Sequence, residues 1–293
     1  MSLAGNDGRP TMTRSDYAHI RIDHAGPLSW LVLNRPDRAN ALSQPMLDEI
    51  SDALERLKED GGPVIAIRGE GKGFSAGLDL DQVGKLGGEP SDPIADRERL
   101  ERNLRRWIAI WDHPKPVIAA VHGYCIAGAS QLCVFCDITV VTEDAKIGEP
   151  TIPIGGGYVA PVWSTLVGPK RAKEMAFVPG NSIDGATAVA WGWANHAVRA
   201  DQLIVAVESL ADRIAKTPRE VLRIKKLSIN RAAEAMGFRS AIGGVPEMDA
   251  LLHLAPAVVA IKRRVDEVGI KAVMAEYRVP PTTPLSRSAQ EKE

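Results

Sequence analysis

Two glycine-rich turns are the part of this sequence best suited to hold a negatively charged oxygen. Residues 69–79 follow an apolar run directly, and residues 121–131 lead from a predicted strand through a turn into the start of a predicted helix. Glycine lets a backbone approach a ligand closely, and the first N–H groups of a helix have no partner inside the helix. Two such turns placed side by side would bind one oxyanion between backbone N–H groups.

Three cysteines raise the separate question of a metal or redox site. Cys133 and Cys136 have the C-x-x-C spacing of such sites, but they stand in the apolar run 132–135, without a second cysteine or histidine pair at metal-binding spacing. We interpret them as buried apolar side chains and expect no metal site. With Cys125 as the remaining thiol, no disulfide framework is indicated, which favours a reducing cytoplasm.

Strand and helix patterns alternate around the two turns. The predicted strands are 29–33, 64–67, 117–121 and 138–141, and the predicted helices between them are 45–58, 95–112 and 128–136. Short connections between alternating strands and helices indicate an α/β fold. After about residue 200 the pattern is helical, with predicted helices at 201–216, 218–235 and 237–271 that would pack on the α/β core or on a neighbouring subunit.

Composition narrows the classes of partner. The 293 residues are 45% apolar and 25% charged, which permits one sizeable core, and the net charge is −1. Neither a nucleic-acid surface nor a membrane surface is therefore expected. Apolar runs also stay well short of the roughly 20 residues that a membrane helix needs.

Several blocks of sequence together resemble the enoyl-CoA hydratase/isomerase, or crotonase, family. The blocks are residues 33–36, 40–42, 73–80, 114–124, 136–138 and 167–174, and the resemblance extends over about residues 16–278. It implies the ClpP-like spiral of ββα units, with an α/β core at 16–200, a helical trimerisation region at 201–278, and flexible tails at 1–15 and 279–293. It also implies assembly as a homotrimer or a dimer of trimers.

The resemblance assigns roles to particular residues. The oxyanion hole would use the backbone N–H groups of Leu78 and Gly128, and would stabilise an enolate formed from a thioester. No cofactor would be bound permanently, because coenzyme A would arrive as part of an acyl-CoA substrate. The residues that match the coenzyme A positions are Arg38, Ala39, Ala41 and Ala76.

Both carboxylates of a hydratase in this family are replaced here. Gln131 and Thr151 stand at the two glutamate positions, so neither can act as an unaided general acid or base at neutral pH. Glu149, two residues before Thr151, is the candidate replacement, because alternate residues of an extended segment share a face. Other ionisable residues near these turns are Tyr158, His122 and Asp79.

Three functions remain open on the sequence alone. The first is a CoA-thioester enzyme with a relocated acid or base, which would catalyse hydration, isomerisation, decarboxylation or C–C cleavage. The second is an acyl-CoA-binding protein without catalysis. The third is a retro-Claisen hydrolase of a diketone that carries no coenzyme A. The intact segment 38–41 favours the CoA-dependent functions over the diketone.

Overall fold

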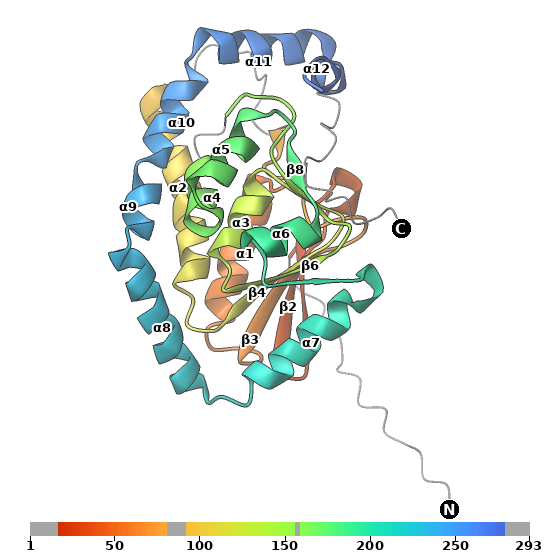
Figure 1. Cartoon of the computed structure of the whole chain (residues 1–293), viewed down its shortest axis with the longest axis vertical. Helices are drawn as coiled ribbons and strands as arrows, with labels where there is room; N and C mark the ends of the chain where they lie inside the picture. Colours follow the sequence, from red (N-terminus) through yellow and green to blue (C-terminus); the bar gives the residue numbers. More distant parts are fainter. Residues whose placement is uncertain (1–16, 81–91, 156–158, 279–293) are drawn as a thin grey trace, which may run out of the picture.

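A computed structural model describes residues 17–80, 92–155 and 159–278, without the side chains of residues 159 and 160. The predicted tails at 1–15 and 279–293 and the candidate Tyr158 lie outside these residues. Figure 1 shows a sheet enclosed by helices, with a column of C-terminal helices along one side. The predicted α/β fold is confirmed by this arrangement.

Six strands form the main sheet in the order β1-β2-β3-β4-β6-β9. Their bounds are β1 Ile20–Ala25, β2 Leu28–Leu33, β3 Val64–Gly69, β4 Val117–Val121, β6 Ile138–Thr142 and β9 His196–Val198. β1 and β2 pair antiparallel, and the remaining neighbours pair parallel. A smaller sheet joins β5 Tyr124–Ile126, β7 Lys146–Gly148 and β8 Ser182–Ile183.

Helices cover both faces of the main sheet, because its strands are apolar on both faces. The helices α1 Gln44–Arg56, α2 Pro93–Trp111 and α3 Gly128–Phe135 contribute to the larger core, which contains Leu31 and Ile67 of the sheet. The helix α7 Leu203–Ile214 packs against the opposite face, on Trp30 and Ala66. The remaining helices of the core region are α4 Val159–Val167, α5 Pro169–Phe177 and α6 Gly185–Trp191.

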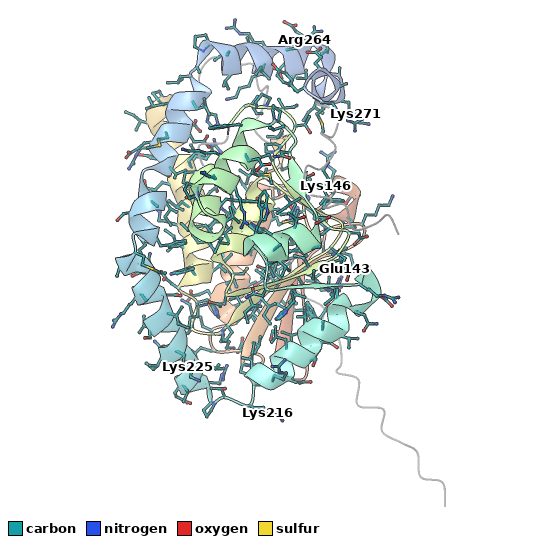
Figure 2. The ribbon with its side chains drawn as sticks, in the orientation of Figure 1. Glu143, Lys146, Lys216, Lys225, Arg264 and Lys271 are labelled. Carbon is teal, nitrogen blue, oxygen red and sulfur yellow. The ribbon has the colours of Figure 1, made fainter. Side chains whose placement is uncertain are left out.

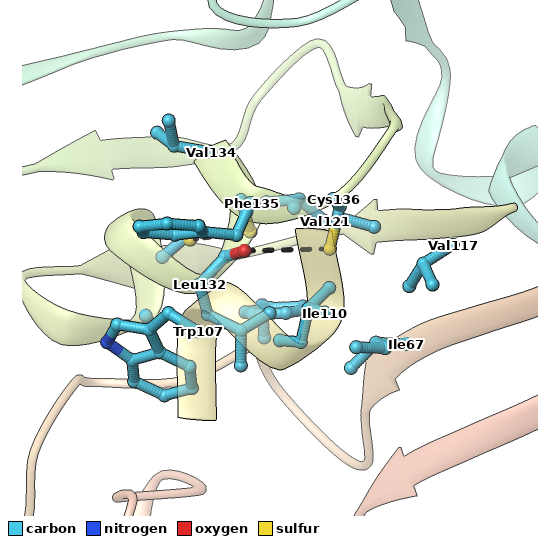
Figure 3. Packing of buried hydrophobic residues seen from close by; sticks show 14 of the residues in the cluster. Ile67, Trp107, Ile110, Val117, Val121, Leu132, Val134, Phe135 and Cys136 are labelled. Atoms are coloured by element: carbon cyan, nitrogen blue, oxygen red, sulfur yellow. Dashed lines mark hydrogen bonds between the residues drawn. The ribbon is translucent and has the colours of Figure 1, made fainter. Parts of the chain in front are cut away.

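The C-x-x-C segment lies in the centre of the larger core, as predicted. Cys133 is 2% exposed and Cys136 is 7% exposed. In Figure 3 the Cys136 sulfur points at the Leu132 carbonyl oxygen, which lies 3.6 Å away. Burial raises the pKa of both thiols well above the ordinary value, so these cysteines are unreactive apolar packing residues.

The C-terminal region is more broken than the sequence pattern predicts. The single predicted helix at 237–271 is divided into α9 Phe238–Gly243, α10 Val245–His253, α11 Pro256–Val268 and the start of α12 Ile270–Glu276. Pro246 and Pro256 stand at the starts of α10 and α11, and Gly269 separates α11 from α12, which explains the breaks. Together with α8 Arg219–Ala235, these helices run along α2 and then turn across the end of the molecule (Figure 1).

Buried polar contacts fasten α8 to the core. The ammonium group of Lys226, which is 8% exposed, donates to Asp137 Oδ2 at 2.7 Å and to the carbonyls of Lys115 and Ile110 at 3.2 and 3.3 Å. Asn230 donates to the Trp111 carbonyl at 2.9 Å. Burial raises the pKa of Asp137 and the nearby Lys226 opposes that shift, so the carboxyl depends on its cationic partner.

The apolar residues of the C-terminal helices divide between an inner and an outer face. Phe238, Ile242 and Val245 are buried in the core of their own chain. Met248 and Leu251 are 63% and 68% exposed, so other apolar residues of these helices face outward. The exposed apolar residues of these helices are Val221, Ile224, Leu227, Ile229, Met236, Met248, Leu251, Val268 and Met274.

Charged residues lie on the surface at both ends of the molecule. Figure 2 shows Arg264 and Lys271 on α11 and α12 at one end, and Lys216 and Lys225 at the other. Arg264 joins α11 to α12 through Glu276 at 3.1 Å. Among the described residues no single helix is long and apolar enough to cross a membrane, although the bent pair 238–253 and 256–268 passes by length and composition.

Replacing Lys226 by methionine is expected to lower the free energy of unfolding by about 3–5 kcal/mol, because Asp137 would stay buried without its partner. Urea unfolding at neutral pH measures the change. Lys225→Met is the matched control, since that side chain is exposed and its loss should change stability by no more than about 0.5 kcal/mol. Equal stability of the two variants would contradict the role of Lys226.

Candidate functional site

The two glycine-rich turns meet edge to edge. Ser75 of the first turn pairs with Cys125 of the second, and the Ile126 N–H donates to the Ser75 carbonyl at 3.1 Å. Gly77 has a φ of +94°, and a Cβ there would lie 2.7 Å from the Ile126 carbonyl oxygen. A side chain at Gly77 would therefore push the two turns apart.

The N–H groups of Leu78 and Gly128 lie next to each other as a result. A Cβ at Gly128 would lie 3.5 Å from the Leu78 nitrogen, and one at Gly77 would lie 3.2 Å from the Gly128 nitrogen. Gly128 is the first residue of α3, whose leading N–H groups have no partner within the helix. Two adjacent donors and the positive end of a helix form the arrangement that stabilises an oxyanion.

Ala127, directly before Gly128, has a strained backbone. Its φ of 52° and ψ of −122° are uncommon for a residue with a side chain, and such a conformation costs on the order of 1–3 kcal/mol. The Ala127 N–H donates to the Gly148 carbonyl at 2.8 Å. This bond fixes the start of α3 against the segment that carries Glu149.

The four predicted coenzyme A residues lie in one pair of contacting loops. The Ala76 N–H donates to the Ala39 carbonyl at 3.0 Å, and the Ala41 N–H donates to the Arg38 carbonyl at 3.0 Å. Ala39 and the next residue, Asn40, both have a φ of 52°. Arg38 is exposed on the surface of this loop. These hydrogen bonds hold the loop in one shape.

Asp79, one of the ionisable residues singled out in the sequence, has a structural partner. Its carboxylate accepts a hydrogen bond from Arg35 Nη1 at 2.8 Å, in an ion pair whose side chains are 14% and 6% exposed. The same Arg35 nitrogen donates to the Ala41 carbonyl at 2.7 Å. Through Arg35, Asp79 of the first glycine-rich turn is therefore joined to the loop that contains residues 38–41.

Gln131 and Glu149 are both buried beside the start of α3. Gln131 is 3% exposed and lies one turn after Ala127, to whose carbonyl its N–H donates at 3.2 Å. Glu149 is 8% exposed and follows Gly148, which binds the Ala127 N–H. Each side chain has one buried oxygen, Oε1, without a hydrogen-bond partner among the described residues. Orphaned buried oxygens at a site of this kind are suited to binding a polar group of a ligand.

Burial raises the pKa of Glu149 to about 7. Desolvation disfavours the charged carboxylate, and no neighbouring cation or donor offsets it in the part of the chain described here. A carboxyl group with a pKa near the working pH exists in both protonation states, so it can accept a proton and return it. Glu149 is therefore the group of this site whose chemistry fits proton transfer.

The other predicted positions have different surroundings. Thr151 is half-buried where the chain bends, and a Cβ at Gly180 would lie 3.1 Å from its hydroxyl oxygen. Because of this bend, the alternation of an extended strand does not relate Thr151 to Glu149. The His122 ring nitrogen Nε2 lies 3.0 Å from the Gly71 carbonyl oxygen, a contact that positions the first glycine turn.

Sequence reasoning missed a histidine and two carboxylates near Gly155. A Cβ at Gly155 would lie 3.4 Å from His253 Nε2 and 3.5 Å from Asp249 Oδ1, and His253 also contacts Asp96. Asp96 and His253 are 157 residues apart in the chain, so no local spacing relates them. The available signal was Asp96 itself, an acidic residue in the first turn of α2.

Comparison with known proteins agrees with this geometry. Residues 27–242 match the family model for enoyl-CoA hydratase/isomerase. A Thermus thermophilus protein assigned to the enoyl-CoA hydratases is 32% identical over 209 residues, which is 69% of this chain and 79% of the relative.

Solved structures extend the likeness to three dimensions. One assigned to the enoyl-CoA hydratases/isomerases of Novosphingobium aromaticivorans DSM 12444 is 49% identical with a TM-score of 0.86, over 90% of this chain and 96% of the other. An enoyl-CoA hydratase/isomerase of Xanthobacter autotrophicus Py2 is 33% identical with a TM-score of 0.84, over 90% and 99% of the two chains. This chain belongs to the enoyl-CoA hydratase/isomerase family.

Proposed function

We propose that this chain is an acyl-CoA enzyme that moves a proton at the α-carbon of a thioester, with Glu149 as its acid and base. The observation that carries the proposal is the buried Glu149 carboxyl, which has one oxygen without a partner among the described residues and a pKa of about 7. Glu149 directly follows Gly148, whose carbonyl accepts from the Ala127 N–H and so fixes the start of α3. The thioester oxygen would lie between the Leu78 and Gly128 N–H groups. The coenzyme A part would lie along Arg38, Ala39, Ala41 and Ala76.

Double-bond isomerisation is the reaction that these residues support best. A carboxylate removes a proton from the α-carbon of a β,γ-unsaturated thioester, and the electron pair moves onto the thioester oxygen as a dienolate. The same group then returns the proton to the γ-carbon. One group with a pKa near neutrality suffices for both transfers. Direct hydration would need a second acid–base group, and Gln131 and Thr151 cannot serve as one unaided.

Two other functions are separate outcomes of the experiments below. A protein that binds acyl-CoA tightly without any proton exchange would be a binding protein. Cleavage of a diketone that carries no coenzyme A would indicate retro-Claisen hydrolysis. The contacts between the segment 38–41 and Ala76 favour a CoA ester over that substrate, because they keep the coenzyme A loop in a defined shape.

Replacing Glu149 by glutamine is expected to slow isomerisation of a β,γ-unsaturated acyl-CoA by about 100–10,000-fold, since the proton carrier is lost and the shape is kept. Formation of the conjugated product is followed by ultraviolet absorbance, and α-proton exchange in D2O by NMR. Glu143→Gln is the control, because that glutamate is exposed before β7 and should leave both rates unchanged. Exchange that survives in Glu149→Gln would show that another group carries the proton.

The pH profile gives a second readout of the same group. Proton removal needs the carboxylate, so kcat/KM should rise with pH through about 7 and level off above it. Stability should change in the opposite sense. The folded protein holds this proton up to about pH 7, whereas the unfolded chain releases it near the ordinary pKa of 4.5. The free energy of unfolding should therefore decrease as the pH rises from 4.5 to about 7. Glu149→Gln should flatten both curves.

Replacing Gly128 by proline is expected to reduce turnover by about 100–1,000-fold, because it removes one oxyanion donor at the helix position that tolerates proline best. Gly128→Ala is the matched control. Alanine keeps the backbone N–H, and its methyl group would lie 3.0 Å from Leu78 Cγ, a side-chain atom that can shift to make room. Circular dichroism checks that both variants fold. Full turnover of folded Gly128→Pro would place the thioester oxygen elsewhere.

We also propose that the chain assembles as a homotrimer or a dimer of trimers. Met248 and Leu251 are the most exposed apolar residues of α10, and exposed apolar surface of this extent usually marks an interface. Because they are three residues apart on one helix, they lie on the same side of it.

Changing Met248 and Leu251 together to glutamate is expected to convert the oligomer into a monomer of 31.6 kDa, measured by analytical ultracentrifugation. Val205→Glu is the control, because Val205 is 60% exposed on α7, away from this face. A wild-type protein that sediments as a monomer at micromolar concentration would refute the assembly.

A further inference from the structure

The peptide group between Ala127 and Gly128 carries one of the two N–H groups proposed to bind the thioester oxygen. Because a peptide group is planar and trans, its carbonyl oxygen and its N–H point in opposite directions. The Ala127 carbonyl accepts from the Gln131 N–H at 3.2 Å inside α3, so the Gly128 N–H points out of the start of this helix. The groups that hold the Ala127 carbonyl therefore set the direction of the Gly128 N–H.

A serine side chain holds the same carbonyl. The Ser130 hydroxyl donates to the Ala127 carbonyl oxygen at 2.8 Å, a shorter contact than the backbone bond from Gln131. Ser130 is 0% exposed, so water does not compete for this bond. The backbone bond already satisfies the carbonyl as a helix requires, and the hydroxyl adds a second donor to it.

Trp163 of α4 determines where the Ser130 hydroxyl proton points. Trp163 Nε1 lies 3.2 Å from Ser130 Oγ, and the indole ring is fully buried. An indole nitrogen can only donate, so Ser130 Oγ accepts from it and keeps its own proton for the Ala127 carbonyl. The hydrogen bonds thus run in one direction, from Trp163 through Ser130 to the peptide group of Ala127 and Gly128.

This chain of hydrogen bonds has two physical effects at the Gly128 N–H. Hydrogen bonds in a chain polarise one another, so a peptide group whose carbonyl accepts two bonds is a stronger donor through its N–H. The chain also restrains the Ala127 backbone, because a strained conformation persists only where surrounding contacts hold it. The bond from the Ala127 N–H to Gly148 restrains the other side of the same residue.

We propose that Ser130 and Trp163 are positioning residues of the oxyanion hole, which orient and polarise the Gly128 N–H through the Ala127 carbonyl. Neither side chain would touch the substrate. The inference rests on the proposed acyl-CoA function and adds two residues that act on the thioester oxygen through the backbone. A serine that only satisfied the buried indole N–H would have no influence on a bound thioester, and this difference can be measured.

Infrared spectroscopy of a bound thioester tests the inference directly. The probe is a saturated straight-chain acyl-CoA labelled with ¹³C at the thioester carbonyl, which has no double bond to isomerise. Its carbonyl band should lie at a lower wavenumber in the wild-type complex than in water, because strong donors weaken the C=O bond. In Ser130→Ala the band should move back toward its position in water.

The kinetics of Ser130→Ala give a second readout. Cooperative strengthening is about 10–30% of the free energy of a bond, and a whole oxyanion donor is worth about 100–1,000-fold in rate. The variant should therefore lower kcat by about 2–8-fold and change KM little, since the bond strengthens in the transition state. Ser51→Ala is the matched control, because the Ser51 hydroxyl donates to the Leu47 carbonyl within α1 at 2.9 Å. It should leave the band and kcat unchanged.

Trp163→Phe tests the first bond of the chain. It removes the indole N–H and keeps an aromatic ring, so the carbonyl band should shift as in Ser130→Ala, by a smaller amount. Added to Ser130→Ala it should cause no further shift, because Trp163 acts only through Ser130. Trp193→Phe is the matched control for the loss of ring volume. Trp193 is also buried, and its Nε1 has no partner among the described residues.

The outcomes separate this inference from the proposed function. Circular dichroism checks that each variant folds. A wild-type carbonyl band that keeps its position in Ser130→Ala, or an equal shift in Trp193→Phe and Trp163→Phe, would overturn the inference and leave the oxyanion hole in place. The expected band shifts together with proton exchange that is independent of Glu149 would overturn only the proposed proton transfer. Failure of the wild-type protein to bind any thioester would overturn both.

Discussion

The close approach of two backbone turns is the constraint on which the rest of this site depends. The N–H groups of Leu78 and Gly128 are adjacent because Gly77 has no side chain, and a single Cβ there would fall 2.7 Å from the Ile126 carbonyl oxygen. The strain of Ala127 is part of the same geometry, since the chain must reverse before α3 begins. The surrounding strands, the Arg35–Asp79 ion pair and the bond from Ala127 to Gly148 hold these turns in place.

Position and desolvation together determine the ionisation of Glu149. The carboxyl lies beside the oxyanion helix through its neighbour Gly148, and burial without a compensating cation raises its pKa to about 7. A family member with two glutamates divides proton handling between two groups. In the mechanism that we propose, Glu149 would handle the proton alone, because Gln131 is polar but not ionisable.

The C-terminal helices have two different faces. Their inner face is fixed by Lys226, Asn230 and apolar residues that enter the core, while their outer face keeps exposed apolar side chains. The same run of helices brings His253 to Asp96, and α11 closes over the segment after Glu149.

Local pattern and motif were enough to determine the α/β core, the family and the two glycine turns, because each depends on residues close together in the chain. The main strands and helices from 29 to 141 lie within a few residues of their predicted bounds, and the C-x-x-C segment is buried as predicted. The six-residue strand β1 was missed, as were the short strands β5, β7, β8 and β9, whose two or three residues give no measurable periodicity. The pKa of Glu149, the engagement of Asp79 by Arg35 and the pairing of His253 with Asp96 were decided only by tertiary structure. Each depends on desolvation or on a partner distant in sequence, which no spacing along the chain records.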